Sequence, residues 1–291
     1  MKTLNEDAFA AAERYMVLNA RLVDRLRFDR HFRKAPAELV HQAVFAYQNL
    51  DGGFGNAIEP DLRGGGSQPQ GVEVAFWMAE DLAACDPARI QAACHWLEAN
   101  STEEGGVPWV LPSVIDDERA PWWQPPGDKP PAAINPTGPI VGMLHAAGVE
   151  HPWIAPATEF CWGAIAAIEE IGAYDALSTL AFLERVPDRD RAEAEFRRLN
   201  PSLRAAATID PDAPGHVHSP LDLAPRPDSL ARRLFSEDEI DLHLDVMIQG
   251  QNEDGGWATN FAMWTPLVTH EWGGYLTLAN LRTLKAYGRI R

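Results

Sequence analysis

Two stretches of the sequence, YQNLDGGFGN (Tyr47–Asn56) and GQNEDGGWAT (Gly250–Thr259), carry the same heptad near opposite ends of the chain. In each, Gln-Asn-x-Asp-Gly-Gly is followed by an aromatic residue. The residues on both sides repeat their apolar positions with the period of an α-helix, so each heptad lies between two predicted helices. The heptad therefore predicts a helix–loop–helix corner that recurs in the fold.

The residue types in the heptad are those of a tight turn. The glutamine falls at a helix C-terminus, where its amide can bond free carbonyl groups. The aspartate can accept backbone N–H groups, the glycine pair supplies positive φ angles, and the aromatic ring anchors the corner on an apolar layer. The residues of this structural repeat are Gln48, Asp51, Phe54, Gln251, Asp254 and Trp257. A degenerate third copy is EANSTEEGGVPW (Glu98–Trp109), with Glu104 before the pair Gly105 and Gly106.

The composition is that of a folded, acidic protein. The 291 residues carry a formal charge of −17, and 46% of them are hydrophobic. Phosphate groups bind to basic faces, so this charge argues against nucleic acid and against an anionic membrane as partners. No run reaches eighteen apolar residues, and the N-terminus is acidic where a signal peptide is apolar, so we expect no integral membrane segment and a cytoplasmic location. We expect the three cysteines to be buried free thiols: Cys85, Cys94 and Cys161.

Helical periodicity runs through most of the chain and strand signatures are nearly absent, which predicts an all-α protein. The predicted helices are 5–28, 36–49, 69–85, 87–99, 137–148, 153–171, 174–186, 188–199, 236–250 and 266–287. Short links make antiparallel neighbours of the helices they join, so the long links gather at one end of the molecule, where we expect function. The long links are 50–68, 100–136, 200–235 and 251–265. Counting helix directions along the chain does not place link 200–235 at the same end as the other long links, which indicates a missing or irregular helix in that link.

The corners resemble the QW-type repeats of squalene–hopene cyclases, oxidosqualene cyclases and related class II terpene cyclases, and the DGGFGG repeats of protein prenyltransferase β subunits. The resemblance implies an (α/α) toroid, in which inner helices ring a central cavity and outer helices surround them. It further implies a single (α/α)-toroid domain over 1–291, built from about five to six helical hairpins, with loops 100–136 and 200–235 as lids over the cavity mouth. In the cyclases the repeat is a structural clamp, which agrees with a turn-forming role here. Similar toroids occur in pectate lyases and complement-type domains, so the fold leaves the function open.

The class II cyclase resemblance implies an aspartic acid that protonates an alkene or an epoxide, within an Asp-x-Asp-Asp motif. The nearest match is SVIDDERAPWW, where Asp116 and Asp117 are candidate acids and Val114 stands in place of the first Asp. A neighbouring carboxylate and an apolar pocket would keep such an acid protonated. TIDPD offers Asp210 and Asp212 as a second, less complete match.

The prenyltransferase resemblance implies a zinc ion held by Asp, Cys and His. Asp61 and His270 stand near two of these places, but Arg63 stands where the Cys is expected. A cationic side chain disfavours a bound zinc ion, so we expect no metal and no cofactor, and an arginine there suits a carboxylate or phosphate ligand better. The pair His216 and His218 is a weak metal signal without further ligands.

The predicted helix 266–287 is an inner helix under the toroid interpretation. His270 and Glu271 near its start are candidate catalytic groups, with helix capping as the alternative for Glu271. Aromatic residues concentrate in or beside the long links, where they can line an apolar cavity, stabilise a carbocation or stack on sugar rings. The candidate substrate-binding residues are Asp61, Arg63, Trp109, Trp122, Trp123, Trp264 and Trp272.

Three functions stay open at this point. The first is a terpene-cyclase-like protein, an enzyme of class II type if it is catalytic, that binds a hydrophobic isoprenoid-type substrate and cyclises or otherwise transforms it by acid catalysis. The second is a carbohydrate-active toroid, a lyase or hydrolase that uses paired carboxylates. The third is a non-catalytic binding or scaffolding protein of the same fold.

Overall fold

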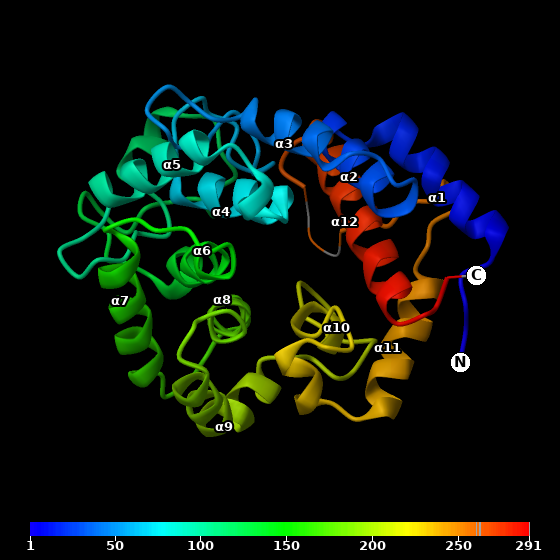
Figure 1. Cartoon of the computed structure of the whole chain (residues 1–291). Helices are drawn as coiled ribbons and strands as arrows, with labels where there is room; N and C mark the ends of the chain where they lie inside the picture. The colour runs from blue at the N-terminus through cyan, green and yellow to red at the C-terminus, as the bar shows by residue number, and fades with distance from the viewer. Residues whose placement is uncertain (260, 262, 291) are drawn as a thin grey trace. The chain divides into compact units, whose positions relative to one another are not determined.

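The computed structural model describes residues 1–259, 261 and 263–290. This part of the chain forms twelve α-helices and three short 3-10 helices and contains no β-strand, which confirms the all-α class (Figure 1). None of the described helices is both long enough and apolar enough to cross a lipid bilayer.

The helices group into two compact units. Unit 1 combines Met1–Ala37 with Asn200–Arg291, and unit 2 is Glu38–Leu199. The helices of unit 1 are α1 (Glu6–Asn19), α2 (Leu22–Phe32), α10 (Pro220–Leu223), η3 (Leu230–Leu234), α11 (Glu237–Gln249) and α12 (Pro266–Ala286). Those of unit 2 are α3 (Ala37–Phe45), α4 (Pro69–Ala79), η1 (Leu82–Ala84), α5 (Pro87–Ala99), η2 (Pro112–Asp116), α6 (Ile134–Ala146), α7 (Ile154–Ala166), α8 (Ala173–Leu183) and most of α9 (Arg189–Ala205).

In unit 2, α6 packs against both α4 and α8, and α7 also packs on α6 (Figure 1). Two glycines on α6 allow the approach of α8. A Cβ atom added at Gly138 would lie 3.0 Å from the Ser178 carbonyl oxygen, and one added at Gly142 would lie 2.8 Å from that of Ala181. Because these glycines are four residues apart, they lie on one face of the helix. The helices that pack on one another in succession, α4, α6 and α8, are thus every second α-helix of this part of the chain.

In unit 1, α12 packs on both α1 and α2. The expected single helix over 5–28 was wrong, because α1 ends at Asn19 and α2 begins at Leu22. Between them Ala20 is extended, with φ −81° and ψ 151°, and it lies against α12, where a Cβ atom added at Gly274 would be 2.7 Å from the Ala20 Cβ. The break thus lies in contact with a helix from the far end of the chain, and local periodicity carries no information about that contact.

Other helix ends also differ from the sequence prediction. α4 stops at Ala79 because Glu80 has φ +67°, and the 3-10 helix η1 follows it. α9 continues to Ala205 rather than ending at 199. The long link 200–235 contains α10 and η3, which is the irregular helical structure expected there.

The first heptad forms a turn that its own side chains hold. The Gln48 Nε2 group donates to the Gly52 carbonyl oxygen and to the Arg89 carbonyl oxygen, both at 2.9 Å. The Gly53 N–H group donates to Asp51 Oδ1 at 2.9 Å. The C-terminal heptad repeats these bonds through Gln251, Asp254, Gly255, Gly256 and the Ala8 carbonyl group. Both aspartates therefore serve as turn acceptors.

The degenerate third copy makes the same turn with a different donor. The Gly105 N–H group donates to the Thr102 carbonyl oxygen at 2.9 Å, as in the other two corners. Ser101 takes the place of the glutamine. The Trp153 Nε1 group donates to the Gly105 carbonyl oxygen at 3.0 Å and to Ser101 Oγ at 2.6 Å. An indole N–H group thus replaces the amide N–H group of the other copies.

Each corner is fixed to another helix of its own unit through its two glycines. The first glycine has φ between +91° and +97° and lies against the helix backbone: a Cβ atom added at Gly52 would be 2.3 Å from the Ala92 carbonyl oxygen in α5. The second glycine lies against the aromatic ring four residues later on that helix, which for Gly53 is Trp96. The equivalent pairs are Pro156 and Phe160 in α7 for the third copy, and Ala11 and Tyr15 in α1 for the C-terminal heptad.

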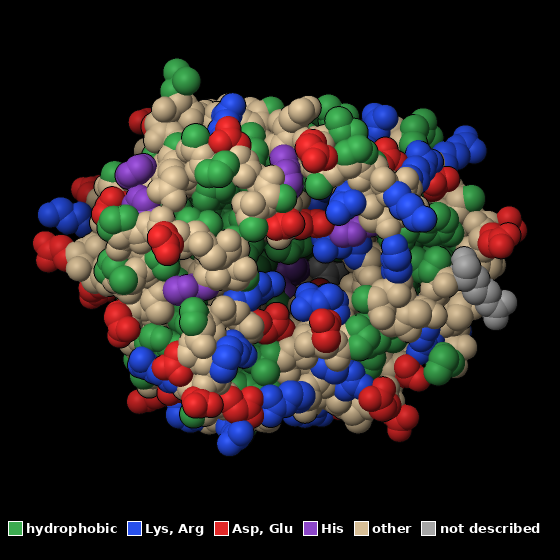
Figure 2. All heavy atoms as spheres, in the orientation of Figure 1, with side chains coloured by type: hydrophobic (Ala, Val, Ile, Leu, Met, Phe, Trp, Pro, Cys, Tyr) green, Lys and Arg blue, Asp and Glu red, His purple; other side chains and the backbone are tan. Residues whose placement is uncertain are grey.

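Apolar side chains fill the interior of both units, and the cysteines lie among them. The three cysteines are buried and form no disulfide, as expected. Burial raises the pKa of Cys85 to about 11 and that of Cys94 to about 12, so both thiols stay protonated at neutral pH. On the face drawn in Figure 2, acidic and basic side chains are interspersed.

We predict that Gly52→Ala destabilises the protein by about 1–3 kcal/mol, because it places a Cβ atom at positive φ and against a backbone carbonyl group. Gly163→Ala is the control: this glycine lies inside α7 with open space around its Cα, so the substitution should stabilise by about 0.5–1 kcal/mol. Urea unfolding of the two variants measures both effects. Equal effects of the two substitutions would contradict the role assigned to the corner contact.

Candidate functional site

One face of α4 combines a carboxyl group with an indole ring. Glu73, Val74 and Trp77 are partly exposed, whereas Val72 and Phe76 on the opposite face are buried. Glu73 and Trp77 are four residues apart, so they neighbour each other on the helix surface. Glu73 is the one charged residue in α4, whose sequence is PQGVEVAFWMA.

The Glu73 side chain is partly exposed, yet protein atoms crowd its carboxyl group and none of the described residues is its partner. It makes no hydrogen bond or ion pair with any described residue, and surrounding protein atoms raise its pKa to about 8 through desolvation alone. Most of the Glu73 population is therefore uncharged at neutral pH and can donate a proton. Sequence reasoning missed this residue because a single Glu in a helix ordinarily marks a solvated face. The available signal was one acid in an otherwise uncharged, aromatic helix.

The N-terminal end of α4 is held to α6 by a polar contact. The Gln70 Nε2 group donates to Asn135 Oδ1 at 2.7 Å. Gln70 precedes Glu73 by three residues and lies on the same side of the helix. The contact holds the start of α4, and the turn that carries Glu73, to α6.

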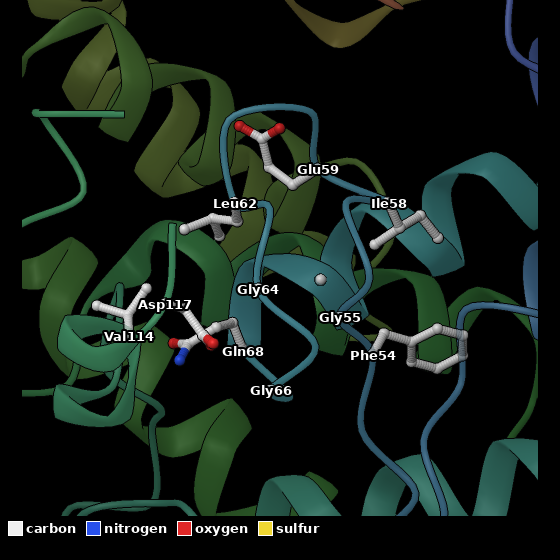
Figure 3. Close-up of a pocket in the computed structure, with 11 residues that line it drawn as sticks. Phe54, Gly55, Ile58, Glu59, Leu62, Gly64, Gly66, Gln68, Val114 and Asp117 are labelled. Atoms are coloured by element: carbon white, nitrogen blue, oxygen red, sulfur yellow. The ribbon is translucent and has the colours of Figure 1, made fainter. Parts of the chain in front are cut away.

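Asp116 ends the 3-10 helix η2 and Asp117 follows it, beside a glycine-rich segment of the same unit. Asp116 is exposed, so no apolar pocket surrounds it. Asp117 lies against the triple glycine of residues 64–66, where a Cβ atom added at Gly64 would be 2.0 Å from the Asp117 Cγ. Asp117, Gly64 and Gly66 border a small cavity, lined also by Phe54 and Gln68, with room for about one water molecule (Figure 3). A substrate-sized molecule does not fit in this cavity.

The two other candidates in this loop layer lie in backbone pairing. Asp61 is buried, and its carbonyl oxygen accepts the Ala120 N–H group at 2.9 Å. The Arg63 N–H group donates to the Glu118 carbonyl oxygen at 2.9 Å. The segments 55–68 and 117–120 are thus joined through their backbones. Figure 3 shows the nearby Glu59 carboxylate pointing away from the cavity.

The tryptophans of link 100–136 form a local stack. Trp109 and Trp123 are stacked with ring centroids 4.5 Å apart, and Trp123 is buried. Trp122 is 42% exposed. The Arg119 Nε group donates to the Trp123 carbonyl oxygen at 2.9 Å and holds the end of this loop. Of the three predicted tryptophans in this link, Trp109 and Trp123 pack on each other within the loop, and Trp122 faces solvent.

In unit 1, a row of aromatic rings leads to the first half of α12. The Trp272 ring contacts Phe261 and Tyr275, with ring centroids 6.2 Å and 5.2 Å apart, and Phe261 contacts His216 at 4.9 Å. His216 also contacts His218. Burial raises the pKa of the Tyr275 hydroxyl well above its usual range, so this hydroxyl stays protonated. Of the predicted residues in this region, the structure brings Trp272 and the two histidines into one group.

The remaining predicted residues of this unit lie at or just before the start of α12 and in the link before α10. His270 is exposed, while Glu271 and Trp264 are partly exposed. Asp210 and Asp212 lie in the link before α10, where the Asp212 N–H group donates to Asp210 Oδ1 at 3.0 Å. Among the described residues, no group of three or more His, Cys, Asp and Glu side chains is arranged to hold a metal ion.

We predict that Glu73 makes the stability of the wild-type protein fall as the pH rises from about 4.5 to about 8. The unfolded chain releases this proton near the lower pH and the folded chain near the upper one, so ionisation favours the unfolded state in between. Glu73→Gln keeps the shape of the protonated group and removes its titration. The difference in unfolding free energy between variant and wild type should therefore grow with pH, by at most about 1.4 kcal/mol per pH unit. A pH-independent difference in urea unfolding would contradict the desolvated state of Glu73.

Comparison with known proteins gives a fold relationship and no family. No family model matches the chain, and no curated protein matches it. A solved structure, the crystal structure of a protein from Actinoplanes, is similar over 97% of this chain and 89% of its own, with a TM-score of 0.56 and 15% sequence identity. At that identity the similarity concerns the fold alone.

Proposed function

We propose that the protein is a terpene-cyclase-like (α/α) toroid that binds a hydrophobic isoprenoid-type substrate and transforms it by acid catalysis. The observation that carries this proposal is the Glu73 carboxyl group: it is desolvated, has no partner among the described residues and lies beside Trp77 on a partly exposed helix face. In this proposal Glu73 is the acid, in place of the aspartates at 116 and 117.

The toroid part of the proposal is supported by two regularities inside the units. The same corner occurs three times, and each copy is fixed to another helix by a glycine pair. In unit 2, α4, α6 and α8 pack in succession, which an alternation of inner and outer helices produces. Under the toroid interpretation these three are inner helices, so the Glu73 face of α4 borders the substrate cavity.

The pKa of the acid selects among substrates. A general acid is most effective when its pKa lies near the working pH, as it does for Glu73, with a pKa of about 8. Such an acid donates well to an oxygen atom that gains negative charge in the transition state. It is a poor donor to a plain alkene, which is a much weaker base. We therefore propose an oxygenated isoprenoid, an epoxide or an allylic alcohol, as the substrate class.

The proposed step conserves charge without a cofactor. The Glu73 O–H bond breaks, its proton bonds to the substrate oxygen, and the electrons of the adjacent C–O bond move to that oxygen. The carbon left behind is cationic, and the face of an indole ring such as that of Trp77 can stabilise it. Loss of a proton from the cation to the carboxylate ends the reaction and restores the acid. An epoxide is thereby isomerised or cyclised, and an allylic alcohol loses water.

We predict that the wild type converts an epoxide such as oxidosqualene, or an alcohol such as farnesol, and leaves squalene unchanged, as measured by mass spectrometry of extracted products. Glu73→Gln should lower turnover by at least about 100-fold, the usual contribution of a general acid, while substrate quenching of tryptophan fluorescence persists. Glu38→Gln, on the exposed side of α3, is the matched control.

The outcomes separate the parts of the proposal. Turnover that Asp117→Asn abolishes and Glu73→Gln leaves intact would assign the acid to the loop. Quenching without turnover would leave a binding protein. Neither quenching nor turnover with any of these isoprenoids would refute the proposed function.

A further inference from the structure

At the junction of α1 and α2, exposed aliphatic side chains lie beside two exposed arginines, in a protein with a net charge of −17. The acidic residues of α1, Glu6, Asp7 and Glu13, lie in the part of that helix before Arg14. Val17, Leu18 and Leu22 are 51%, 67% and 62% exposed. The exposed residues Arg14 and Arg25 flank them and make no ion pair with any described residue. We name this group, Arg14, Val17, Leu18, Leu22 and Arg25, the basic face.

Helical spacing groups the residues of the basic face on each of the two helices. On α1, Arg14, Val17 and Leu18 are three and four residues apart, so they share one side of the helix. On α2, Leu22 and Arg25 are three residues apart. The two helices pack on each other and are joined by two residues only. Aliphatic side chains therefore lie between two exposed cations.

The same unit carries a face of the opposite charge on α11. This helix has five acidic residues and no Lys or Arg between Glu237 and Gln249. Leu242 and Val246 are 44% and 36% exposed, and the exposed Asp238 precedes Leu242 by one turn. Asp238 makes no ion pair with a described residue, whereas Asp241 beside it is bonded to Arg289. We name Asp238, Leu242 and Val246 the acidic face.

We propose that the basic face of one molecule docks on the acidic face of a second copy of this chain. The two faces match in both respects, aliphatic side chains against aliphatic side chains and unpaired cations against an unpaired carboxylate. Both faces are exposed within one chain, so they do not cover each other there and the contact has to form between molecules.

Two considerations select a second copy over a lipid surface. The basic face exposes three aliphatic side chains and no Trp, Tyr or Phe, the residues that usually anchor a protein at a membrane interface. The rest of the protein is acidic and would be repelled by anionic lipid, while it supplies the complementary face itself.

A twofold dimer makes the contact twice, because each molecule offers both faces. A single contact of five residues with three is small beside a stable interface of about 800 Å² per partner. Two copies of the contact double the buried area, which favours the closed dimer over an open chain of molecules.

Sedimentation velocity over a range of protein concentrations tests this proposal. We expect a wild-type dimer whose dissociation constant rises when salt is raised from about 0.05 M to 0.5 M, since salt screens exposed charges. Leu18→Asp on the basic face and Leu242→Arg on the acidic face should each raise the dissociation constant at least about tenfold. Leu50→Glu, a substitution of a still more exposed leucine in the first corner, should leave the dimer intact.

A mixture of the two disrupted variants gives the decisive result. Each keeps the face that the other lacks, and at the second contact the new charges are opposite, so an equimolar mixture should form a heterodimer. A monomeric wild type, a dimer that survives Leu18→Asp or Leu242→Arg, or a mixture that stays monomeric would overturn the proposal. Binding of the monomer to phosphatidylserine vesicles, lost in Leu18→Asp, would show that the basic face serves a membrane instead. Far-ultraviolet circular dichroism checks that each variant is folded.

Discussion

A glycine with no side chain, pressed against the carbonyl group of another helix, is the contact on which much of this structure depends. At Gly52 and Gly255 there is no room for a methyl group, and the positive φ angle is one that other residues adopt only with strain. The glutamine and aspartate of each heptad hold the turn in the shape that brings the glycine to that position. The turn is thus built from its own hydrogen bonds, and the helix it meets completes it.

The candidate site follows from the same corner. Phe54, the aromatic residue of the first heptad, places its carbonyl oxygen where a Cβ atom added at Gly71 would lie 2.2 Å away, at the start of α4. The Phe54 carbonyl oxygen also accepts the Gln68 N–H group at 3.0 Å. The corner therefore sets where α4 begins and which of its faces is buried. Glu73 lies on the other face as a consequence.

The sequence predicts much of the fold and little of the candidate site. The all-α class and most helices follow from periodicity, because burial of one face imposes the 3.6-residue repeat locally. The break at Ala20 does not follow, because the close contact of Ala20 with Gly274 on α12 joins residues far apart in the sequence. Glu73 escaped notice for a similar reason: its pKa depends on which atoms surround the carboxyl group, and a sequence does not list them. The aromatic partners Trp96, Phe160 and Tyr15 were not predictable either, because the helix that each corner meets is known only from the structure.

The contacts within unit 1 determine the order in which parts of the chain can fold during synthesis. α1 receives its glycine corner from Gly255, near the other end of the chain, whereas the two corners of unit 2 find their helices within Glu38–Leu199. A ribosome releases the whole of unit 2 before it has made the segment that α1 requires. The N-terminal helices therefore wait for the C-terminal ones, and the first part of the polypeptide to emerge is among the last to be packed.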